Sequence, residues 1–468
     1  MAAGGGGQAF AVLVTKKEMV AALSPLQEHW LPLSNLDLLL PPVNVSVFFC
    51  YKKPIGTNMM SYGAMVGVLK KALAHTLVSY YALAGEVVAN SAGEPEILCN
   101  NNGVEFVEAF ADVELQHLNL YNPDESIEGK LAPQKKHGVL AVQATELKCG
   151  ALVVGCTFDH RIADAYSANM FLVSWTEMAQ SKPLSTLPSF RRSSLNPRRP
   201  LNIDSSLDDI YVPVSAIPPP RDSTIAPDDH LASRIYYVKA SDLNRLQSLT
   251  GSNCYKRTKL ESMSALLWKI VAKSSTKTNP HNVVSRMGIV VDGRTRLSQD
   301  NVNKAKTMSN YFGNVLSIPY GGIKVDDLIE KPLDWVTDEV HDFLENGVTK
   351  EHFLGLIDWV EAKRPGPVLA KIYVGDKDDG PAFVVSSGQR FPVSEIDFGW
   401  AKPYFGSYHF PWGGRAGYVM PMPSPAVNGD WVVYMHLTVG QLELVEAEAS
   451  HMFRPLTYDY LNNVDIAN

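Results

Sequence analysis

The sequence predicts an α/β or α+β protein in two parts, with mixed β-sheets flanked by helices. Three observations support this fold class. The chain has 468 residues, too many for one typical domain of about 100–200 residues. Segments typical of strands and of helices interleave in both halves of the chain. Between the halves lies a stretch of prolines and charges that has the periodicity of neither a helix nor a strand.

That stretch divides the chain. We expect a first domain over residues 1–187, a crossover linker over 188–230 and a second domain over 231–468. The linker holds runs such as Pro197–Pro200 and Ile217–Pro220. Proline fixes its own φ angle and lacks an amide hydrogen, so these runs favour an extended segment without a core of its own.

Each half holds several regular elements. β-branched and aromatic runs predict strands, and apolar residues at helical spacing predict helices. In the first half we expect strands at 43–51, 139–145 and 151–158, and helices at 69–80 and 168–178. In the second half we expect strands at 234–238, 287–292, 382–386, 415–420 and 431–437, and helices at 260–272 and 442–452.

Composition limits the classes of function. With 46% hydrophobic and 19% charged residues the chain is globular rather than disordered. A net charge of −7 argues against nucleic acid or an anionic membrane as the main partner. The five cysteines are scattered and form no Cys-x-x-Cys pair, so we expect reduced thiols. We find no signal peptide and no apolar run of about 20 residues, so we expect a cytoplasmic protein.

His160 is the candidate catalytic residue. The segment His160-Arg-Ile-Ala-Asp164 follows directly on the strand expected at 151–158. A histidine at the end of a strand is held rigidly, and its imidazole exchanges a proton near neutral pH, which suits a general base. One His-x-x-x-Asp is also about the number expected by chance among 12 histidines. Because no His-Glu-x-x-His pattern is present, we predict no metal site.

Several blocks resemble the BAHD family of plant acyl-CoA-dependent acyltransferases. Two match that family's signature motifs in their usual order, namely His160–Asp164 and Asp397-Phe398-Gly399-Trp400. Further similar blocks are LSNLD at 33–37, YYALAG at 80–85, VDGR at 291–294 and YFGN at 311–314. The stretches 27–37 and 159–169 are more narrowly similar to coniferyl alcohol acyltransferases.

The resemblance implies a fold and a site. It implies two chloramphenicol-acetyltransferase-like domains joined by a long crossover loop, with a channel between them. Acyl-CoA as co-substrate and a small-molecule acceptor would meet at His160, without a permanently bound cofactor, in a monomer. It also implies structural roles for the second motif and for Asp164, which would pair with Arg294. The alternative for Asp164 is an exposed residue at the start of a helix, stabilised by the helix dipole.

This sequence departs from the family pattern at three places. Ala165 and Ala401 stand where the family has glycine, which is tolerable unless those glycines need a positive φ. The third is Ser386-Ser387-Gly388, where hydroxycinnamoyltransferases have Thr-Ser-Trp. Either Ser386 or a backbone amide would then contact the oxyanion, or the pocket is enlarged at Gly388 for a different substrate.

A basic turn is the candidate CoA-binding segment. It comprises Lys256, Arg257, Thr258 and Lys259, and Thr258 has capping-box spacing to Glu261. Amide groups at a helix N-terminus together with basic side chains suit a phosphate, and the family position favours CoA. The alternative is a solvated basic turn with an ordinary helix cap.

These observations predict an acyl-CoA-dependent acyltransferase. It would move an acyl group, with acetyl as the first choice, from CoA to the hydroxyl of a phenylpropanoid-type alcohol similar to coniferyl alcohol. One alternative is a transferase that carries a hydroxycinnamoyl or benzoyl group to an alcohol or an amine. Another is a non-catalytic relative that binds acyl-CoA or phenolics.

Overall fold

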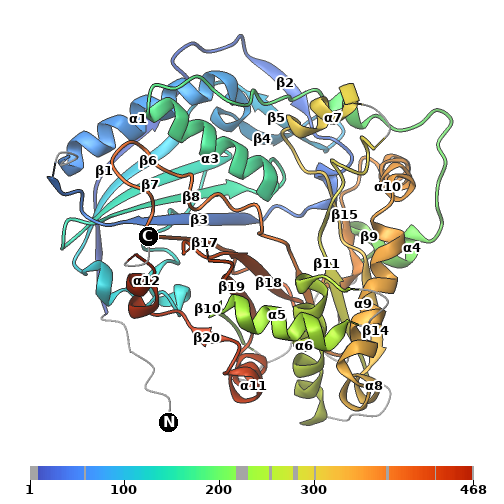
Figure 1. The fold of residues 1–468 in the computed structure, drawn as a ribbon. Helices are drawn as coiled ribbons and strands as arrows, with labels where there is room; N and C mark the ends of the chain where they lie inside the picture. The colour runs from blue at the N-terminus through green and yellow to red at the C-terminus, as the bar shows by residue number, and fades with distance from the viewer. Residues whose placement is uncertain are drawn as a thin grey trace.

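Two mixed β-sheets, each covered by helices, form the molecule (Figure 1). The computed structural model describes residues 9–56, 60–217, 230–251, 256–277, 283–299, 302–375, 379–426 and 428–465. The predicted fold class, mixed sheets flanked by helices, is confirmed. No helix in this described part of the chain is both long and apolar enough to cross a bilayer.

The first sheet has six strands. Strands β6 and β7 are parallel, whereas the other neighbours are antiparallel. Helices α1 (Tyr62–Ser79) and α3 (Ala165–Ala179) lie together over one face of the sheet (Figure 1). In spatial order the strands are β1 (Val12–Val20), β6 (Val104–Ala111), β7 (Leu140–Leu147), β8 (Leu152–Asp159), β3 (Asn44–Tyr51) and β17 (Phe405–His409).

Strand β17 belongs to the second half of the sequence but lies in the first sheet. It pairs antiparallel with β3, where Phe405 is opposite Cys50 and His409 is opposite Ser46. The first sheet is therefore not built from residues 1–187 alone. This exchanged strand carries the chain directly from the first sheet into the second at residues 410–416.

The second sheet has seven strands, with β16 parallel to both of its neighbours. Helices α5 (Ala240–Thr250), α6 (Lys259–Ala272), α9 (Leu333–Gly347) and α11 (Val439–Ala449) share a core with it. In spatial order the strands are β14 (Tyr320–Lys324), β11 (Val284–Ile289), β16 (Ala382–Val385), β18 (Gly417–Pro423), β19 (Trp431–Thr438), β10 (Leu231–Val238) and β20 (Arg454–Pro455).

Smaller elements complete the fold. A three-stranded sheet is made of β2 (His29–Pro32), β5 (Pro95–Cys99) and β4 (Glu86–Ala89). Two short pairs are β12 (Val291–Asp292) with β13 (Leu316–Ser317) and β9 (Tyr211–Pro213) with β15 (Val368–Ala370). The remaining helices are α2 (Pro123–Ser126), α4 (Leu207–Ile210), α7 (Val302–Ser309), α8 (Val325–Glu330), α10 (Lys350–Lys363) and α12 (Tyr458–Asp465).

The predicted elements are present, with two corrections. The strand expected at 287–292 is interrupted at Val290, so it forms β11 and then the short β12. The linker is not wholly irregular, because α4 and β9 lie in it and β9 pairs with β15 of the second half. Residues 218–229 of the linker lie outside the described residues.

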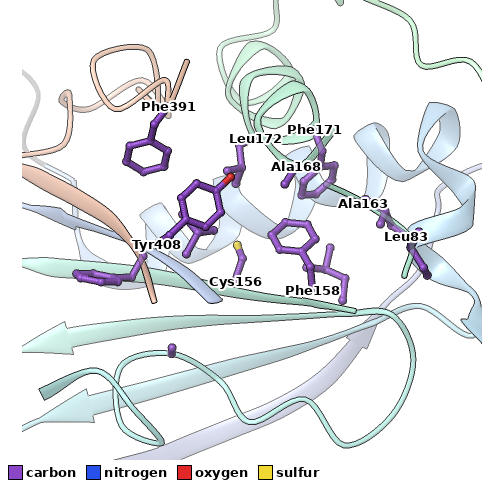
Figure 2. Close-up of a cluster of buried hydrophobic side chains, with 14 of the residues drawn as sticks. Leu83, Cys156, Phe158, Ala163, Ala168, Phe171, Leu172, Phe391 and Tyr408 are labelled. Atoms are coloured by element: carbon purple, nitrogen blue, oxygen red, sulfur yellow. The ribbon is translucent and has the colours of Figure 1, made fainter. Parts of the chain in front are cut away.

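Helix α3 is held on β8 by a buried apolar cluster, shown in Figure 2. Phe158 of β8 meets Phe171 of α3 with ring centroids 5.9 Å apart. Tyr408 of β17 and Phe391 lie beside them, 5.1 Å apart. Burying side chains of this size contributes roughly 1.5–3 kcal/mol each. The packing therefore fixes both ends of the short connection from β8 to α3, residues 160–164.

Candidate active site

His160 lies in that connection, and its main chain is held from two sides. Its amide donates a hydrogen bond of 2.9 Å to the carbonyl of Val43 on the neighbouring chain segment. Its carbonyl accepts a hydrogen bond of 2.9 Å from Nδ2 of Asn314 in the second half. Both halves of the chain thus contribute to the position of this histidine.

The His160 side chain lines a cavity of about 430 Å³ between the two halves. The edge of its ring faces Phe410, with centroids 6.2 Å apart and planes at 70°. Its Nδ1 atom is buried and has no hydrogen-bond partner among the described residues. An imidazole held by packing at the wall of a cavity is suited to exchange a proton with a bound molecule.

The rest of the cavity wall is mostly apolar and aromatic. Both halves contribute to it, so the cavity exists only when the two sheets are together. This lining suits an apolar or aromatic group with a few polar atoms. Prominent lining residues are Val43, Val45, Phe158, Tyr166, Ile289, Val291, Tyr373, Ser386, Tyr408, Phe410, Trp412, Tyr418 and Met420.

Asp164 fulfils both roles considered from the sequence at once. Its carboxylate accepts hydrogen bonds from NH1 and NH2 of Arg294 at 2.7 and 3.1 Å. It also caps α3, because Oδ1 accepts from the amide of Ser167 at 2.9 Å. Both partners of the ion pair are at least 97% buried, so the exposed alternative is wrong. Burial works against the charge of Arg294, yet the adjacent Asp164 and Asp292 carboxylates hold its pKa above the usual value.

Two sequence blocks meet behind the histidine, which sequence reasoning missed. Asp37 of the LSNLD block is fully buried and accepts hydrogen bonds from the backbone and side-chain nitrogens of Asn314, at 2.7 and 2.9 Å. Ser34 also donates to Asp37, from its amide and its hydroxyl. Asn314 in turn bonds to His160. The only signal in the sequence was that both blocks are typical of the family.

The second motif packs away from the cavity. The Asp397 carboxylate accepts a hydrogen bond from the amide of Gly399 at 2.8 Å, and Gly399 has a φ of 105°. The Trp400 ring lies against Tyr51 of β3, with centroids 6.0 Å apart. None of these residues lines the cavity, so the motif joins the loop before β17 to the first sheet.

The three departures have different consequences. Ala165 and Ala401 do not adopt a positive φ, so their methyl groups cause no backbone strain. Gly388 lines the cavity, but the alternative of a pocket enlarged at this residue has no support in the direction that a side chain would take. A Cβ atom there would lie 2.6 Å from Cγ of Met422 and 2.8 Å from the carbonyl oxygen of Pro421. Strand β18 already fills the space in that direction.

Ser386 lines the cavity and is 9% exposed. Its amide donates to the carbonyl of Val419, and the amide of Gly388 donates to Pro421, each at 2.9 Å. These two amides are therefore already used within the sheet, whereas the Ser386 hydroxyl is in hydrogen-bond contact with Tyr418, another residue that lines the cavity. Burial raises the pKa of Tyr418 to about 12, although a hydrogen bond with Ser386 acts in the opposite direction.

The candidate CoA segment is not brought to the cavity. Thr258 caps α6 in a capping box with Glu261, as the spacing predicts. Arg257 is engaged by Asp338 of α9 at 2.8 Å. None of Lys256, Arg257, Thr258 and Lys259 is among the cavity-lining residues. The carboxylate of Glu261 occupies the N-terminus of α6, where a phosphate would otherwise bind.

Arg296 is a cavity residue that sequence reasoning missed. It lines the wall two residues after Arg294, and its Nε atom is buried without a hydrogen-bond partner in the described part of the chain. A buried donor without a partner costs free energy that a bound acceptor would recover. Within the described ranges, no group of three or more histidine, cysteine or acidic side chains is arranged to hold a metal ion.

The fold defines the general class of protein. Vinorine synthase has a TM-score of 0.68 to this chain at 20% identity, covering 94% of this chain and 98% of that one. TRI101 of F. graminearum, complexed with coenzyme A and deoxynivalenol, has a TM-score of 0.72 at 14% identity, covering 91% and 99%. The architecture is therefore that of the two-domain, chloramphenicol-acetyltransferase-like proteins.

Sequence comparison makes the assignment more specific. A family model described as the Transferase family matches residues 10–452. The chain belongs to this family, the BAHD acyltransferases that use acyl-CoA as co-substrate. Shikimate O-hydroxycinnamoyltransferase of Nicotiana tabacum is 26% identical over 94% of this chain and 97% of its own length. Omega-hydroxypalmitate O-feruloyl transferase of Arabidopsis thaliana is 27% identical over 79% and 78%, and benzyl alcohol O-benzoyltransferase of Petunia hybrida is 27% identical over 85% and 83%.

Proposed function

We propose that this protein transfers an acyl group from CoA to the hydroxyl of a phenylpropanoid-type alcohol, with His160 as general base. One observation carries the proposal. The His160 side chain lines a cavity to which both halves contribute aromatic side chains. An aromatic alcohol and an acyl thioester fit such a wall, and their reaction needs a proton acceptor at this point.

In the proposed reaction the acceptor oxygen attacks the thioester carbonyl while its proton passes to His160. A C–O bond forms, and the carbonyl becomes a tetrahedral oxyanion. This intermediate then collapses, the C–S bond breaks, and the CoA thiolate leaves and takes up the proton from the imidazolium. Thiols are far more acidic than alcohols, so the thiolate is the better leaving group. The transfer is direct and needs no acyl-enzyme.

The Ser386 hydroxyl is our candidate oxyanion donor. The amides of residues 386 and 388 already donate to β18, so we choose the Ser386 hydroxyl, which also hydrogen-bonds with Tyr418, as the donor to test in this segment. Removal of one such donor from a preorganised site reduces turnover by about 100- to 1000-fold. Ser386→Ala should therefore lower kcat more than it raises KM.

An aromatic acyl donor is the second candidate. The relatives named above carry feruloyl, hydroxycinnamoyl or benzoyl groups in their names, whereas coniferyl alcohol is not among these names. The aromatic lining of the cavity suits either a bulky donor or a bulky acceptor. We therefore place acetyl-, benzoyl- and feruloyl-CoA on an equal footing as donors in the test.

The test measures thiol release from these three donors, each offered with coniferyl alcohol and with benzyl alcohol. His160→Ala should lower release by about 100- to 10,000-fold, while the control His117→Ala, at an exposed site, should match the wild type. Circular dichroism checks that both variants fold. Release that survives His160→Ala would refute the base. No release by the wild-type protein with any pair would favour the non-catalytic alternative.

A further inference from the structure

A chain of buried polar side chains lies directly behind the aromatic wall, which we define as Phe410 and Trp412. It consists of Ser233 on β10 and Tyr434 and His436 on β19, each at most 4% exposed. Ser233 is opposite His436 in the antiparallel pair of strands. Tyr434 is two residues before His436 and therefore points to the same face of the sheet.

Hydrogen bonds through these three side chains connect Phe410 to Trp412, the two ends of the wall. The amide of Phe410 donates to the hydroxyl oxygen of Tyr434 at 3.1 Å. The hydroxyls of Tyr434 and Ser233 are 3.1 Å apart, and Ser233 Oγ is 3.0 Å from Nδ1 of His436. Nε2 of His436 is 3.2 Å from the carbonyl oxygen of Trp412.

The end groups determine the direction of every hydrogen bond between them. The carbonyl of Trp412 only accepts, so Nε2 of His436 must carry the hydrogen. In a neutral imidazole Nδ1 is then an acceptor, and the Ser233 hydroxyl donates to it. The Tyr434 hydroxyl accordingly donates to Ser233 and accepts from the amide of Phe410. The cation would also keep a donor in each of the four contacts, but it would leave the Tyr434 hydroxyl hydrogen without an acceptor; only the neutral, Nε2-protonated form of His436 gives every one of these hydrogens an acceptor.

The position of the wall matters for the cavity. Phe410 meets the ring of His160 at 6.2 Å and the ring of Tyr418 at 5.1 Å. Trp412 meets Tyr373 at 4.7 Å. A shift of the backbone at residues 410–412 would therefore change both the room beside the base and the shape of the aromatic surface.

We propose that Ser233, Tyr434 and His436 are positioning residues that hold the Phe410–Trp412 wall against His160 and thereby set which acyl and acceptor groups the cavity takes. This inference rests on the proposed function in one respect, because it takes the cavity as the place where substrates bind. None of the three residues lines the cavity, so they act only through the wall.

These hydrogen bonds also change in a defined way when His436 is protonated. If His436 gains a proton, Nδ1 becomes a donor to Ser233, Ser233 turns towards Tyr434, and the buried Tyr434 hydroxyl loses its acceptor. Burial lowers the pKa of His436, and His409 of β17 acts in the same direction, whereas Asp124 and Glu128 act against it. The neutral form and the intact chain are therefore the state near neutral pH.

The activity test compares acyl donors of different size. Tyr434→Phe keeps the ring and removes the hydroxyl, which leaves the amide of Phe410 without its acceptor. His436→Gln retains a donor for the carbonyl of Trp412 but has no acceptor at the position of Nδ1, whereas His436→Phe removes both groups. We measure kcat/KM for feruloyl-CoA and acetyl-CoA and take the ratio of the two. We expect Tyr434→Phe and His436→Phe to change it by about tenfold, and His436→Gln to change it less.

Tyr236→Phe is the matched control. Tyr236 is a fully buried tyrosine on β10, and its hydroxyl donates to Glu446 at 2.8 Å, away from the cavity. It should lose thermal stability as Tyr434→Phe does, yet leave the donor ratio unchanged. Equal ratios in wild type, Tyr434→Phe and His436→Phe would overturn the proposal, because lost stability alone predicts that result.

A second measurement does not need turnover. Protein labelled with ¹⁵N-histidine reports the tautomer of His436, whose signals are assigned by their loss in His436→Gln. The proposal requires the neutral, Nε2-protonated form near pH 7, and the Nδ1-protonated or cationic form would overturn it. If the wild type releases no thiol from any donor, the proposed function is wrong. The tautomer of His436 still shows whether the hydrogen bonds through Ser233 and Tyr434 have the proposed directions.

The donor ratio should also depend on pH. Protonation of His160 slows transfer from both donors alike and cancels in the ratio, whereas protonation of His436 does not. We expect the wild-type ratio to move towards that of Tyr434→Phe as the pH falls through the His436 transition. The donor ratio of His436→Gln should stay constant with pH. The proposal would be contradicted if the His436 tautomer changes with pH while the wild-type donor ratio does not.

Discussion

Asn314 donates one hydrogen bond of 2.9 Å to the carbonyl of His160 and another of 2.9 Å to the carboxylate of Asp37. The three residues come from three distant parts of the chain. The two bonds between Asn314 and Asp37 are buried, and the bond to His160 is partly buried. The position of the candidate base is thus tied to the N-terminal block and to the second half at a single side chain.

Loss of the Asn314 side chain should affect both folding and transfer. Asn314→Ala leaves the carbonyl of His160 without its donor and removes one of the two donors to Asp37 Oδ1, which should cost about 1–3 kcal/mol in the free energy of unfolding. A small displacement of His160 should lower kcat by up to about 100-fold. Urea unfolding and thiol release measure the two effects. The control Asn119→Ala removes an exposed bond to Glu125 and a partly buried one from the amide of Asn122, and an equal effect of both variants on thiol release would contradict the assignment.

The Asp164–Arg294 pair should be strongly coupled. Removal of one partner leaves a buried charge, so Asp164→Asn and Arg294→Gln should each destabilise the fold by about 3–5 kcal/mol. The double variant should cost clearly less than the sum of the two. A double-mutant cycle by urea unfolding measures this coupling. The partly exposed pair Arg454–Asp242 should show a coupling of only about 0–1 kcal/mol.

A side chain at Gly388 should not be tolerated well. Gly388→Ala brings its methyl group against Pro421 and Met422, and such overpacking costs about 1–3 kcal/mol. The exposed helix position Gly67 has no neighbour within 4 Å of an added Cβ. Gly67→Ala should therefore stabilise the protein by about 0.5–1 kcal/mol. If Gly388→Ala unfolds at the same temperature as the wild type, the predicted overpacking against β18 is wrong.

Stability in acid should depend on Glu261. Burial tends to raise the pKa of this carboxyl, but hydrogen bonds with Thr258 and His341 outweigh it and hold the pKa below its usual 4.5. A pKa that is lower in the folded state contributes stability above the unfolded value, and this contribution is lost as the pH falls through the folded value.

Glu261→Gln should therefore be less stable than the wild type near neutral pH, and the gap should narrow below a pH of about 4.5. Urea unfolding at several pH values between about 6 and 3 measures the gap. Glu448, in the half-exposed pair with Lys273, provides the control Glu448→Gln, for which we expect a smaller gap. A gap at Glu261 that widens in acid would reverse the sign of the argument.

Local patterns were sufficient for much of the fold. The runs at 43–51 and 151–158 became β3 and β8 because β-branched and aromatic side chains suit a buried strand. The Thr258–Glu261 spacing identified the start of α6 because a capping box is a local interaction. Strand β17 was not predicted, since its five residues have no alternation that a short window detects.

The sequence by itself determined the class of fold, the family and the place of His160 between a strand and a helix, because these depend on local patterns and on the order of motifs. Only the tertiary structure decided that Asp164 is at once a cap and an ion-pair partner, that a side chain at Gly388 would meet β18, and that Arg257 is engaged by Asp338. Each of these depends on which distant residues come within hydrogen-bond or van der Waals distance, and that follows from tertiary packing, between the halves for Asp164 and within the second half for Gly388 and Arg257, not from any local pattern.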